Sequence, residues 1–350
     1  MKARIFSILI SIVLAAGIFT GCQKVDTTSQ GSATGTSVTT TPSTTDAPGS
    51  TAAIDSATNS ATAATAYPLT IKDAKGTEVT IKTKPVKIVS LPLGVCEMLL
   101  SLVDSDRMAA MTYYVDDPTV SNIADVVKGV GKRVDFNAEK IIALQPDLVL
   151  VDTWQDANTV KQLREANINV FVVTAAVSID QEQELLKTLG KLTDTSPKAD
   201  EIINWMDQKL NAVTEKLSSI KEEQKLSIID YSEMGTTSGK DTNFDDIVKR
   251  AGLVNPVSKA GLSGWPQLSK EMVVQYNPDI IYLPSWYYDN KVSFESLSKS
   301  IKGDKSLAGV KAVKNNKIIS ISFNHITTTS QYSVLAVEEM AKAAYPELFK

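Results

Sequence analysis

Aromatic side chains gather where the predicted strands of this chain end, and three of its four tryptophans are among them. The fourth, Trp205, falls within a predicted helix and fits core packing, which is the plain alternative for all of them. Core aromatics usually lie within helices and strands, however, whereas these lie at strand ends or in adjoining loops. Aromatic walls of that kind suit a large, flat, partly apolar ligand. The candidate ligand-binding residues of this set are Trp154, Trp265, Trp286, Tyr113, Tyr231 and Tyr287.

Catalytic chemistry has little support in the sequence. His325 is the one histidine, which rules out a multi-histidine metal site. The motifs G-x-S-x-G and H-E-x-x-H are absent, and nothing pairs a nucleophile with a base. His325 follows the last predicted strand and stays a candidate ligand contact, although a surface or hydrogen-bonded polar role is commoner. We expect a binding protein, not an enzyme, with no metal site or cofactor of its own; a weak hydrolase, which turnover by the purified protein would reveal, is the least favoured alternative.

Two stretches of the chain echo each other. Each predicts a short capped helix, a turn at Pro-Asp and a buried strand that ends in an aromatic residue. A glutamate stands in the first turn of each short helix, where a capping charge is the plain interpretation. The identical residues, each pair 132 positions apart, are Glu139 and Glu271, Pro146 and Pro278, Asp147 and Asp279, and Trp154 and Trp286.

A long helix is predicted between the two copies. Apolar residues recur at steps of three and four through residues 197–224, which is one stripe of an α-helix about 40 Å long. Strands alternate with helices on both sides of it, which predicts parallel sheets in both lobes. We therefore expect an α/β protein with two Rossmann-like lobes, residues 67–193 and 225–350, joined by one long α-helix in residues 194–224. Ligands bind such sheets outside the carboxyl ends of the strands.

The N-terminus predicts export and lipid anchoring. Residues 1–21 combine a basic start with an apolar run of about 14 residues, shorter than the roughly 20 that span a membrane. The run ends in Phe19-Thr20-Gly21-Cys22, which resembles the lipobox of bacterial lipoproteins, although Phe19 departs from the usual small aliphatic residue. The resemblance implies that Cys22 is lipidated; an ordinary signal peptide with an incidental cysteine is the alternative. Residues 22–66 are rich in Ser and Thr and predict a disordered tether.

Composition narrows the function further. The net charge of −4, with both signs mixed, gives no basic field for nucleic acid. Cys22 and Cys96 are the two cysteines, so no intrachain disulfide remains once Cys22 is lipidated. Cys96 lies in an apolar helical run and is expected to be a buried small hydrophobe.

The whole layout resembles the substrate-binding lipoproteins of ABC importers for iron-siderophores and cobalamin, the class III periplasmic binding proteins, over about residues 86–350. Residues 265–271, which read WPQLSKE, are similar to a segment of the cobalamin-binding member. There the tryptophan lines the ligand cleft and the glutamate docks on an arginine of the permease. The resemblance therefore implies that Trp265 contacts ligand and that Glu271, with Glu139 as its counterpart, docks on the permease. Arg133 stands where the cobalamin binder is aromatic, and we include it among the candidate ligand contacts.

The resemblance implies a lipid-anchored receptor on the extracytoplasmic face of the cell membrane. It would act as a monomer, bind a metal chelate between its lobes with modest closure, and deliver it to the permease. A corrinoid and a ferric siderophore are equally favoured, with haem third. A lipid-anchored sensor or adhesin with the same fold is the alternative, and neighbouring permease and ATPase genes would separate the two.

Overall fold

The computed structural model describes residues 65–232, 234–287 and 292–350. The predicted signal peptide, Cys22 and almost all of the tether lie outside these residues. Within the described ranges, no helix combines the length and the apolar character that crossing a membrane requires.

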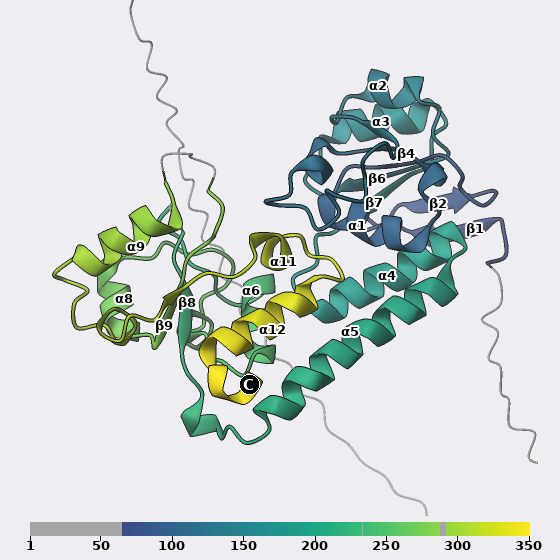
Figure 1. The fold of residues 1–350 in the computed structure, drawn as a ribbon. Coiled ribbons are helices and arrows are strands. Elements are labelled where there is room, and N and C mark those ends of the chain that lie inside the picture. Colours follow the sequence, from purple (N-terminus) through teal and green to yellow (C-terminus); the bar gives the residue numbers. More distant parts are fainter. Residues whose placement is uncertain (1–64, 233, 288–291) are drawn as a thin grey trace, which may run out of the picture. The chain divides into compact units, whose positions relative to one another are not determined.

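The first lobe holds an antiparallel hairpin and a parallel sheet of five strands in the order β5-β4-β3-β6-β7 (Figure 1). Its strands are β1 (Leu69–Lys72), β2 (Glu78–Ile81), β3 (Ile88–Ser90), β4 (Met108–Met111), β5 (Lys132–Arg133), β6 (Leu148–Asp152) and β7 (Val170–Val173). Its helices are α1 (Leu93–Leu102), α2 (Ala138–Ala143), α3 (Ala157–Glu165) and α4 (Ile179–Thr193), with 3-10 turns η1 (Ser105–Arg107) and η2 (Tyr113–Asp116). The strand order reverses direction between β3 and β6, which is where such sheets bind ligands.

The second lobe holds a parallel sheet of three strands in the order β10-β9-β8. The strands are β8 (Ile228–Asp230), β9 (Ile280–Tyr282) and β10 (Ile318–Ile319). The helices are α6 (Asn243–Arg250), α7 (Pro256–Lys259), α8 (Lys270–Tyr276), α9 (Phe294–Gly303), α10 (Lys311–Lys314), α11 (Phe323–Thr327) and α12 (Ser333–Ala344), followed by η4 (Pro346–Phe349). Parallel sheets in both lobes confirm the predicted fold class.

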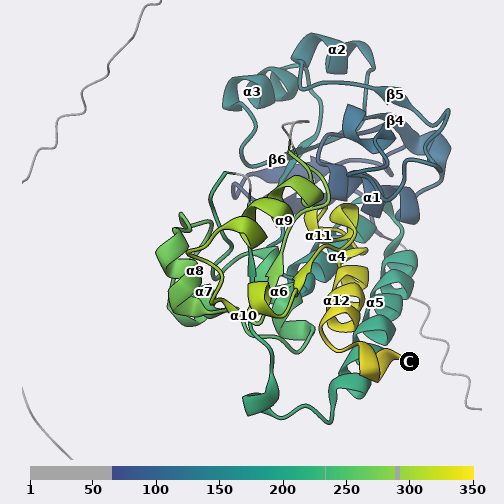
Figure 2. The same cartoon turned by 60° about the vertical axis from the view of Figure 1, so that its left-hand side comes forward.

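The connecting helix α5 (Ser196–Leu217) ends before the predicted Gln224. The hydroxyl of Ser218 donates to the carbonyl of Glu215 at 2.7 Å and so takes the acceptor that a further helical turn would use. A short 3-10 turn, η3 (Glu222–Gln224), follows. The helix α4 runs alongside α5 (Figures 1 and 2). The connection between the lobes is therefore a pair of helices and not a single one.

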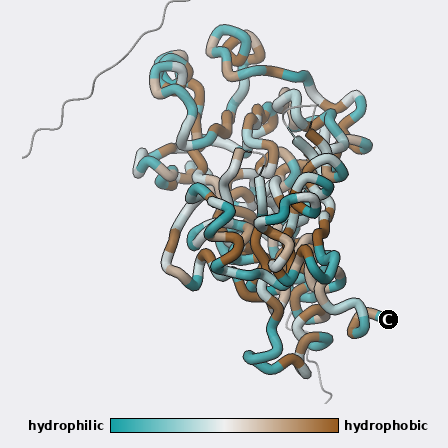
Figure 3. The backbone as a smooth tube through the Cα atoms, turned by 90° about the vertical axis from the view of Figure 1, so that its left-hand side faces the viewer, coloured by the Kyte–Doolittle hydropathy of each residue, from teal (hydrophilic) through white to brown (hydrophobic). Residues whose placement is uncertain are grey.

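One hydrophobic core runs through both lobes. Its largest cluster joins β-strand residues of the first sheet to α1 and α4, continues through α5 by way of Met206 and Val213, and reaches α6 and α12 on the second sheet. Two smaller clusters lie on the outer faces, one under α2 and α3 and the other under α7 to α10. Apolar segments accordingly lie inside the fold, whereas hydrophilic ones lie on the outer turns (Figure 3). Because the lobes share a core, their relative movement is restricted.

The 132-residue echo proves to be structural. Asp147 accepts the backbone N–H groups of Val86 at 2.7 Å and Lys87 at 3.0 Å, just before β3. Asp279 accepts the backbone N–H of Ser227 at 2.9 Å, just before β8. Each Pro-Asp turn therefore fixes the start of the first parallel strand of its own lobe.

Candidate ligand-binding site

A cleft of about 290 Å³ lies at the carboxyl ends of β7, β8 and β9. The segment that follows β7 forms one wall, and the second lobe forms the rest. The residues that line it are Ala175, Ala176, Val177, Asp230, Ser238, Thr242, Asn243, Phe244, Trp265, Tyr282, Pro284, Phe323, Ile326, Thr327 and Thr329. The cleft lies outside the carboxyl ends of parallel strands, as expected for a ligand site, but at the edge strand β7 and not between β3 and β6, where the strand order of the first sheet reverses.

Aromatic rings form much of the cleft surface. Trp265 leaves 67% of its surface exposed, which is unusual for so large a side chain. Two further lining rings, those of Phe244 and Tyr282, lie 5.8 Å apart at 34°. An exposed indole and a packed pair of aromatic rings in one cleft can hold a flat, partly apolar ligand by stacking and burial of its surface.

The polar side of the cleft is built around Asp230, the last residue of β8. Its carboxylate accepts the hydroxyl of Thr237 at 2.7 Å, the hydroxyl of Ser238 at 2.7 Å and the backbone N–H of Ser238 at 2.6 Å. Burial raises the pKa of Asp230, and these hydrogen bonds offset only part of that rise. The Asp230 carboxyl group therefore lies at the cleft with no cationic partner among the described residues.

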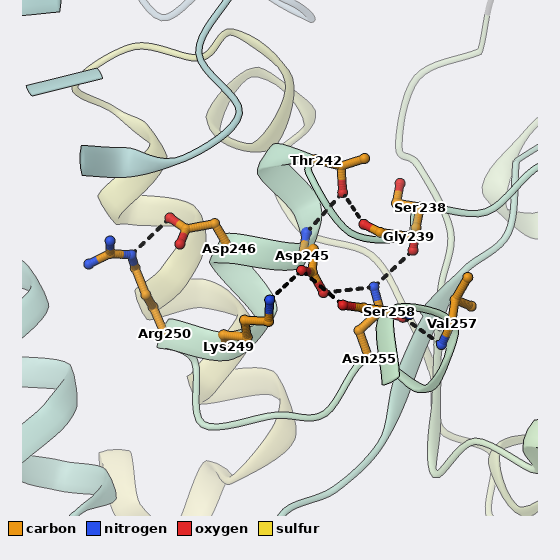
Figure 4. A network of polar contacts seen from close by, with 10 residues as sticks. All are labelled: Ser238, Gly239, Thr242, Asp245, Asp246, Lys249, Arg250, Asn255, Val257 and Ser258. Atoms are coloured by element: carbon orange, nitrogen blue, oxygen red, sulfur yellow. Dashed lines mark hydrogen bonds and ion pairs between the residues drawn. The ribbon is translucent and has the colours of Figure 1, made fainter. Parts of the chain in front are cut away.

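A network behind the cleft holds α6 and its preceding loop in place (Figure 4). Asp245 accepts hydrogen bonds from Lys249, from Asn255 at 3.1 Å and from Ser258 at 3.1 Å. Asn255 in turn donates to the backbone carbonyl of Ser238 at 2.8 Å. The network thus fixes Ser238 on the cleft surface relative to the start of α6.

The amino-acid sequence of the chain was compared with known protein families. The model of the periplasmic binding protein family matches residues 88–324, well over half of the chain. The chain belongs to this family. The family is one of solute-binding proteins, and the predicted family and fold class are confirmed.

Relatives support the predicted transport role. A Bacillus subtilis protein named an ABC transporter substrate-binding lipoprotein is 30% identical over 81% of this chain and 88% of its own. A cobalamin-binding protein of Halobacterium salinarum is 27% identical over 80% of this chain and 74% of its own. The solved structure of Helicobacter pylori CeuE with nickel and histidine has a TM-score of 0.65 and 21% identity, covering 80% of this chain and 89% of that one. The last likeness shows the shared fold alone.

Of the sequence-predicted contacts in this binding protein, Trp265 lines the cleft. Trp286 packs against Phe323, a lining residue, with ring centroids 5.4 Å apart. Tyr231 is half-buried against the outer core of the second lobe, and Tyr287 is buried. Tyr113 and Trp154 are exposed on the first lobe. None of these five, Trp286 included, lines the cleft among the described residues, and their role in binding stays a prediction.

Arg133 is held within the first lobe of the binding protein. Its guanidinium donates to both carboxylate oxygens of Asp116 at 2.7 Å and to the carbonyls of Val130 and Val127 at 2.8 and 3.1 Å. Ligand contact would have to compete with these bonds, and it stays a prediction.

His325 follows the last strand, as predicted, and lies on the helix α11, because β10 ends at Ile319 and the chain then turns into that helix. Its Nδ1 is 2.8 Å from Oε1 of Glu339, a hydrogen-bonded polar role. Burial raises the pKa of Glu339, but the hydrogen bonds from His325 and Ser322 outweigh it and leave that pKa lowered. Ligand contact by His325 stays untested. Cys96 is buried as expected, and burial raises the pKa of its thiol to about 12.

Sequence reasoning missed most of the cleft. Asp230 carried a usable signal, since a carboxylate directly after two buried isoleucines must find partners at the strand end. Asn243 and Phe244 stand at an ordinary helix start, and nothing local separates them from other helix starts. They reach the cleft because α6 packs against α11 and α12 and because the ring of Phe244 packs on Tyr282 of β9.

The two predicted docking glutamates occupy matching places on the binding protein. Glu139 is exposed in the first turn of α2, which Asn137 caps, and Glu271 is exposed in the first turn of α8, which Ser269 caps. The backbone N–H of Glu271 and the Ser269 hydroxyl lower the pKa of the Glu271 carboxyl. The capped helices confirm the predicted local structure, whereas docking remains to be tested.

A second cavity, of about 580 Å³, lies in the first lobe beside α3. Asp152, at the end of β6, borders this cavity with 7% of its surface exposed. Within the part of the chain that the structure describes, no donor reaches its carboxylate. Burial raises the pKa of Asp152 to about 6.

This burial predicts a pH-dependent stability. An unfolded Asp titrates near 3.9, so the native state binds the Asp152 proton more tightly than the unfolded state. The contribution of the protonated Asp152 carboxyl to the free energy of unfolding is fully present below about pH 4 and is lost as the pH rises through about 6. Asp152→Asn should therefore match the parent at pH 4 and exceed its free energy of unfolding by about 1–3 kcal/mol at pH 8. Urea unfolding at both pH values measures this difference.

Asp304 supplies a control of opposite sign. Hydrogen bonds from Lys270 and Ser306 lower the pKa of Asp304 to about 2. Asp304→Asn should therefore be less stable than the parent at pH 8 and should approach it near pH 2. A variant Asp152→Asn that never gains on the parent between pH 4 and pH 8 would show that the native carboxyl is not perturbed.

Proposed function

We propose that this chain is the membrane-anchored solute receptor of an ABC importer for a metal chelate. It binds the chelate in the cleft at the carboxyl ends of β7, β8 and β9 and delivers it to the permease. The observation that carries the proposal is that the exposed Trp265 and the packed rings of Phe244 and Tyr282 line one cleft. It acts as a monomer, catalyses no reaction and needs no cofactor, since the metal arrives within the cargo.

Among metal chelates, the cleft favours an uncharged one. Asp230 is the charged residue of its lining, and no lysine, arginine or histidine lines it among the described residues. A corrinoid or a neutral siderophore fits such a surface better than an anionic siderophore or haem with its carboxylates. The cleft volume of about 290 Å³ is at the low end for ligand pockets, so it would hold one edge of the chelate.

Delivery of the chelate to the permease would use the matching helix starts of α2 and α8. Glu139 and Glu271 are presented from matching helix starts on the two lobes, and a two-fold permease would offer one cationic partner to each. Lipidation of Cys22 and the tether of residues 22–66 would keep the receptor at the extracytoplasmic face of the membrane, within reach of the permease. The shared core supports only modest closure on binding.

Replacement of Trp265 by alanine tests the cleft. We expect Trp265→Ala to weaken binding of the cognate chelate by about 1–3 kcal/mol, the range for losing an aromatic anchor. Isothermal titration with candidate corrinoids and siderophores measures it, and the visible absorption spectrum of protein from its native cell identifies which chelate to use.

Met234→Ala is the matched control, since Met234 is an exposed apolar residue of the same lobe that does not line the cleft. Its affinity should equal that of the parent. Equal affinity of Trp265→Ala and the parent would place the ligand elsewhere.

A further inference from the structure

Two polar atoms in the lining residues of the cleft have no hydrogen-bond partner among the residues that the structure describes. They are Oη of Tyr282 and Oδ1 of Asn243, and both are fully buried. Leaving such atoms unpaired destabilises the native state, so their retention needs a reason.

The surrounding contacts keep these atoms in place. The amide nitrogen of Asn243 donates to the carbonyl of Ile326 at 3.1 Å, which commits that nitrogen and leaves Oδ1 as the unused acceptor. Tyr282 pairs with Asp230 across β9 and β8, and its ring packs on Phe244. The hydroxyl of Tyr282 can both donate and accept.

Charge limits what could satisfy this pair. Asp230 stands beside Tyr282 with no cation in the cleft lining, so a ligand carboxylate placed there would face a like charge in a poorly solvated site. An ammonium could donate to Asn243 but offers no acceptor to the Tyr282 hydroxyl. A primary amide offers both, because its N–H₂ donates and its C=O accepts.

We infer that the floor of the cleft recognises a primary amide of the ligand, which donates to Asn243 Oδ1, accepts from Tyr282 Oη, and is selected over a carboxylate by Asp230. The inference rests on the proposed function and adds the chemical group by which the chelate is chosen. Both protein atoms are buried in the ligand-free chain, so binding must repack the side chains that cover them.

A set of corrinoids tests the selection. Cyanocobalamin carries several primary amides, and analogues exist in which one amide at a time is hydrolysed to a carboxylate. We expect the parent to reject one of these analogues by roughly 10- to 100-fold in Kd relative to cyanocobalamin. In Asp230→Asn, which keeps the size of the side chain and removes its charge, that ratio should fall to about threefold or less. Equal binding of all analogues by the parent, or an unchanged ratio in the variant, overturns the inference.

Two tyrosine variants separate recognition from folding. Tyr282→Phe removes an unpaired hydroxyl and should melt no lower than the parent, yet bind roughly 3- to 30-fold more weakly. Tyr345 lies outside the cleft, where its hydroxyl accepts from Leu226 N–H at 2.9 Å and donates to the Gly252 carbonyl at 3.0 Å. Tyr345→Phe should show the reverse pattern, a lower melting temperature and unchanged affinity. Parent-like affinity of Tyr282→Phe refutes the role of the hydroxyl.

Failure of this inference is distinguishable from failure of the proposed function. A parent that binds neither corrinoids, nor ferrichrome, nor ferric catecholates, nor haem is not a chelate receptor. A parent that binds only an anionic chelate keeps the proposed function and overturns the amide site. A parent that binds ferrichrome but no corrinoid likewise keeps the proposed function and overturns the amide site, because ferrichrome carries no primary amide.

Discussion

Charge reversal at both Glu139 and Glu271 is expected to abolish uptake of the ligand while leaving its binding to the purified protein unchanged. Both carboxylates are exposed in the first turn of a capped helix, one on each lobe. If each meets an arginine on one half of a two-fold permease, Glu139→Arg with Glu271→Arg places like charges face to face. We expect uptake by cells to fall more than tenfold, with a melting temperature within a few degrees of the parent.

The matched control is Glu295→Arg. Glu295 is an exposed glutamate in the first turn of α9, two residues after the capping Ser293, as Glu271 is two residues after Ser269. Glu295→Arg removes the same favourable interaction with a helix N-terminus, but Glu295 lies outside the two repeated stretches, so uptake should stay normal. Normal uptake by the double variant at normal expression would reduce Glu139 and Glu271 to helix-start charges. Such a result would also revive the alternative of a sensor or adhesin without a permease.

Truncation of Glu97 should cause the largest loss of stability. Glu97 is fully buried on α1, and its carboxylate accepts the backbone N–H of Asn122 at 2.8 Å, the Asn122 amide at 3.0 Å and the hydroxyl of Ser330. Burial raises the pKa of Glu97, and these donors offset only part of the rise. Glu97→Ala would leave a cavity and several buried donors unpaired, for which we expect a loss of about 3–5 kcal/mol in the free energy of unfolding.

Thermal and urea unfolding of three variants on one helix would resolve the origin of that loss. Glu97→Gln keeps the volume and one acceptor oxygen, so it should lose less than Glu97→Ala. Ser101→Ala removes the acceptor of the Gln331 amide, which donates at 3.0 Å, and a hydroxyl that donates to the Glu97 carbonyl at 3.1 Å, and it should lose least. If all three variants are equally stable, the contact between α1 and the segment before α12 does not contribute to stability.

These contacts explain why the lobes form one body. Glu97 reaches Ser330 across 233 positions of sequence, and Glu182 on α4 accepts the hydroxyl of Ser333 on α12 at 2.7 Å. Burial raises the pKa of Glu182 well above its usual value. Together with the shared core through α5, these bonds connect each lobe to the helices of the other.

Local patterns in the sequence were sufficient for the architecture. The period of apolar residues predicted the long helix, and the paired Pro-Asp turns predicted the repeated helix-turn-strand units, because both depend on neighbours a few residues away. The end of α5 was missed by several residues; in the structure the Ser218 hydroxyl competes there for the carbonyl of Glu215, a contact that the apolar period does not reveal. The caps of α2 and α8, which present Glu139 and Glu271, were likewise determined by residues within three positions.

The composition of the cleft was decided only by tertiary structure. The resemblance implied that Trp265 contacts ligand, and Trp265 does line the cleft. Trp286, however, packs against Phe323 and Arg133 pairs with Asp116, because the partners of a side chain at a strand end come from other segments. Asn243 and Tyr282 meet at the cleft although 39 positions separate them. A strand end has the same local sequence whether its side chain faces solvent, core or ligand, so packing between distant segments determines which it is.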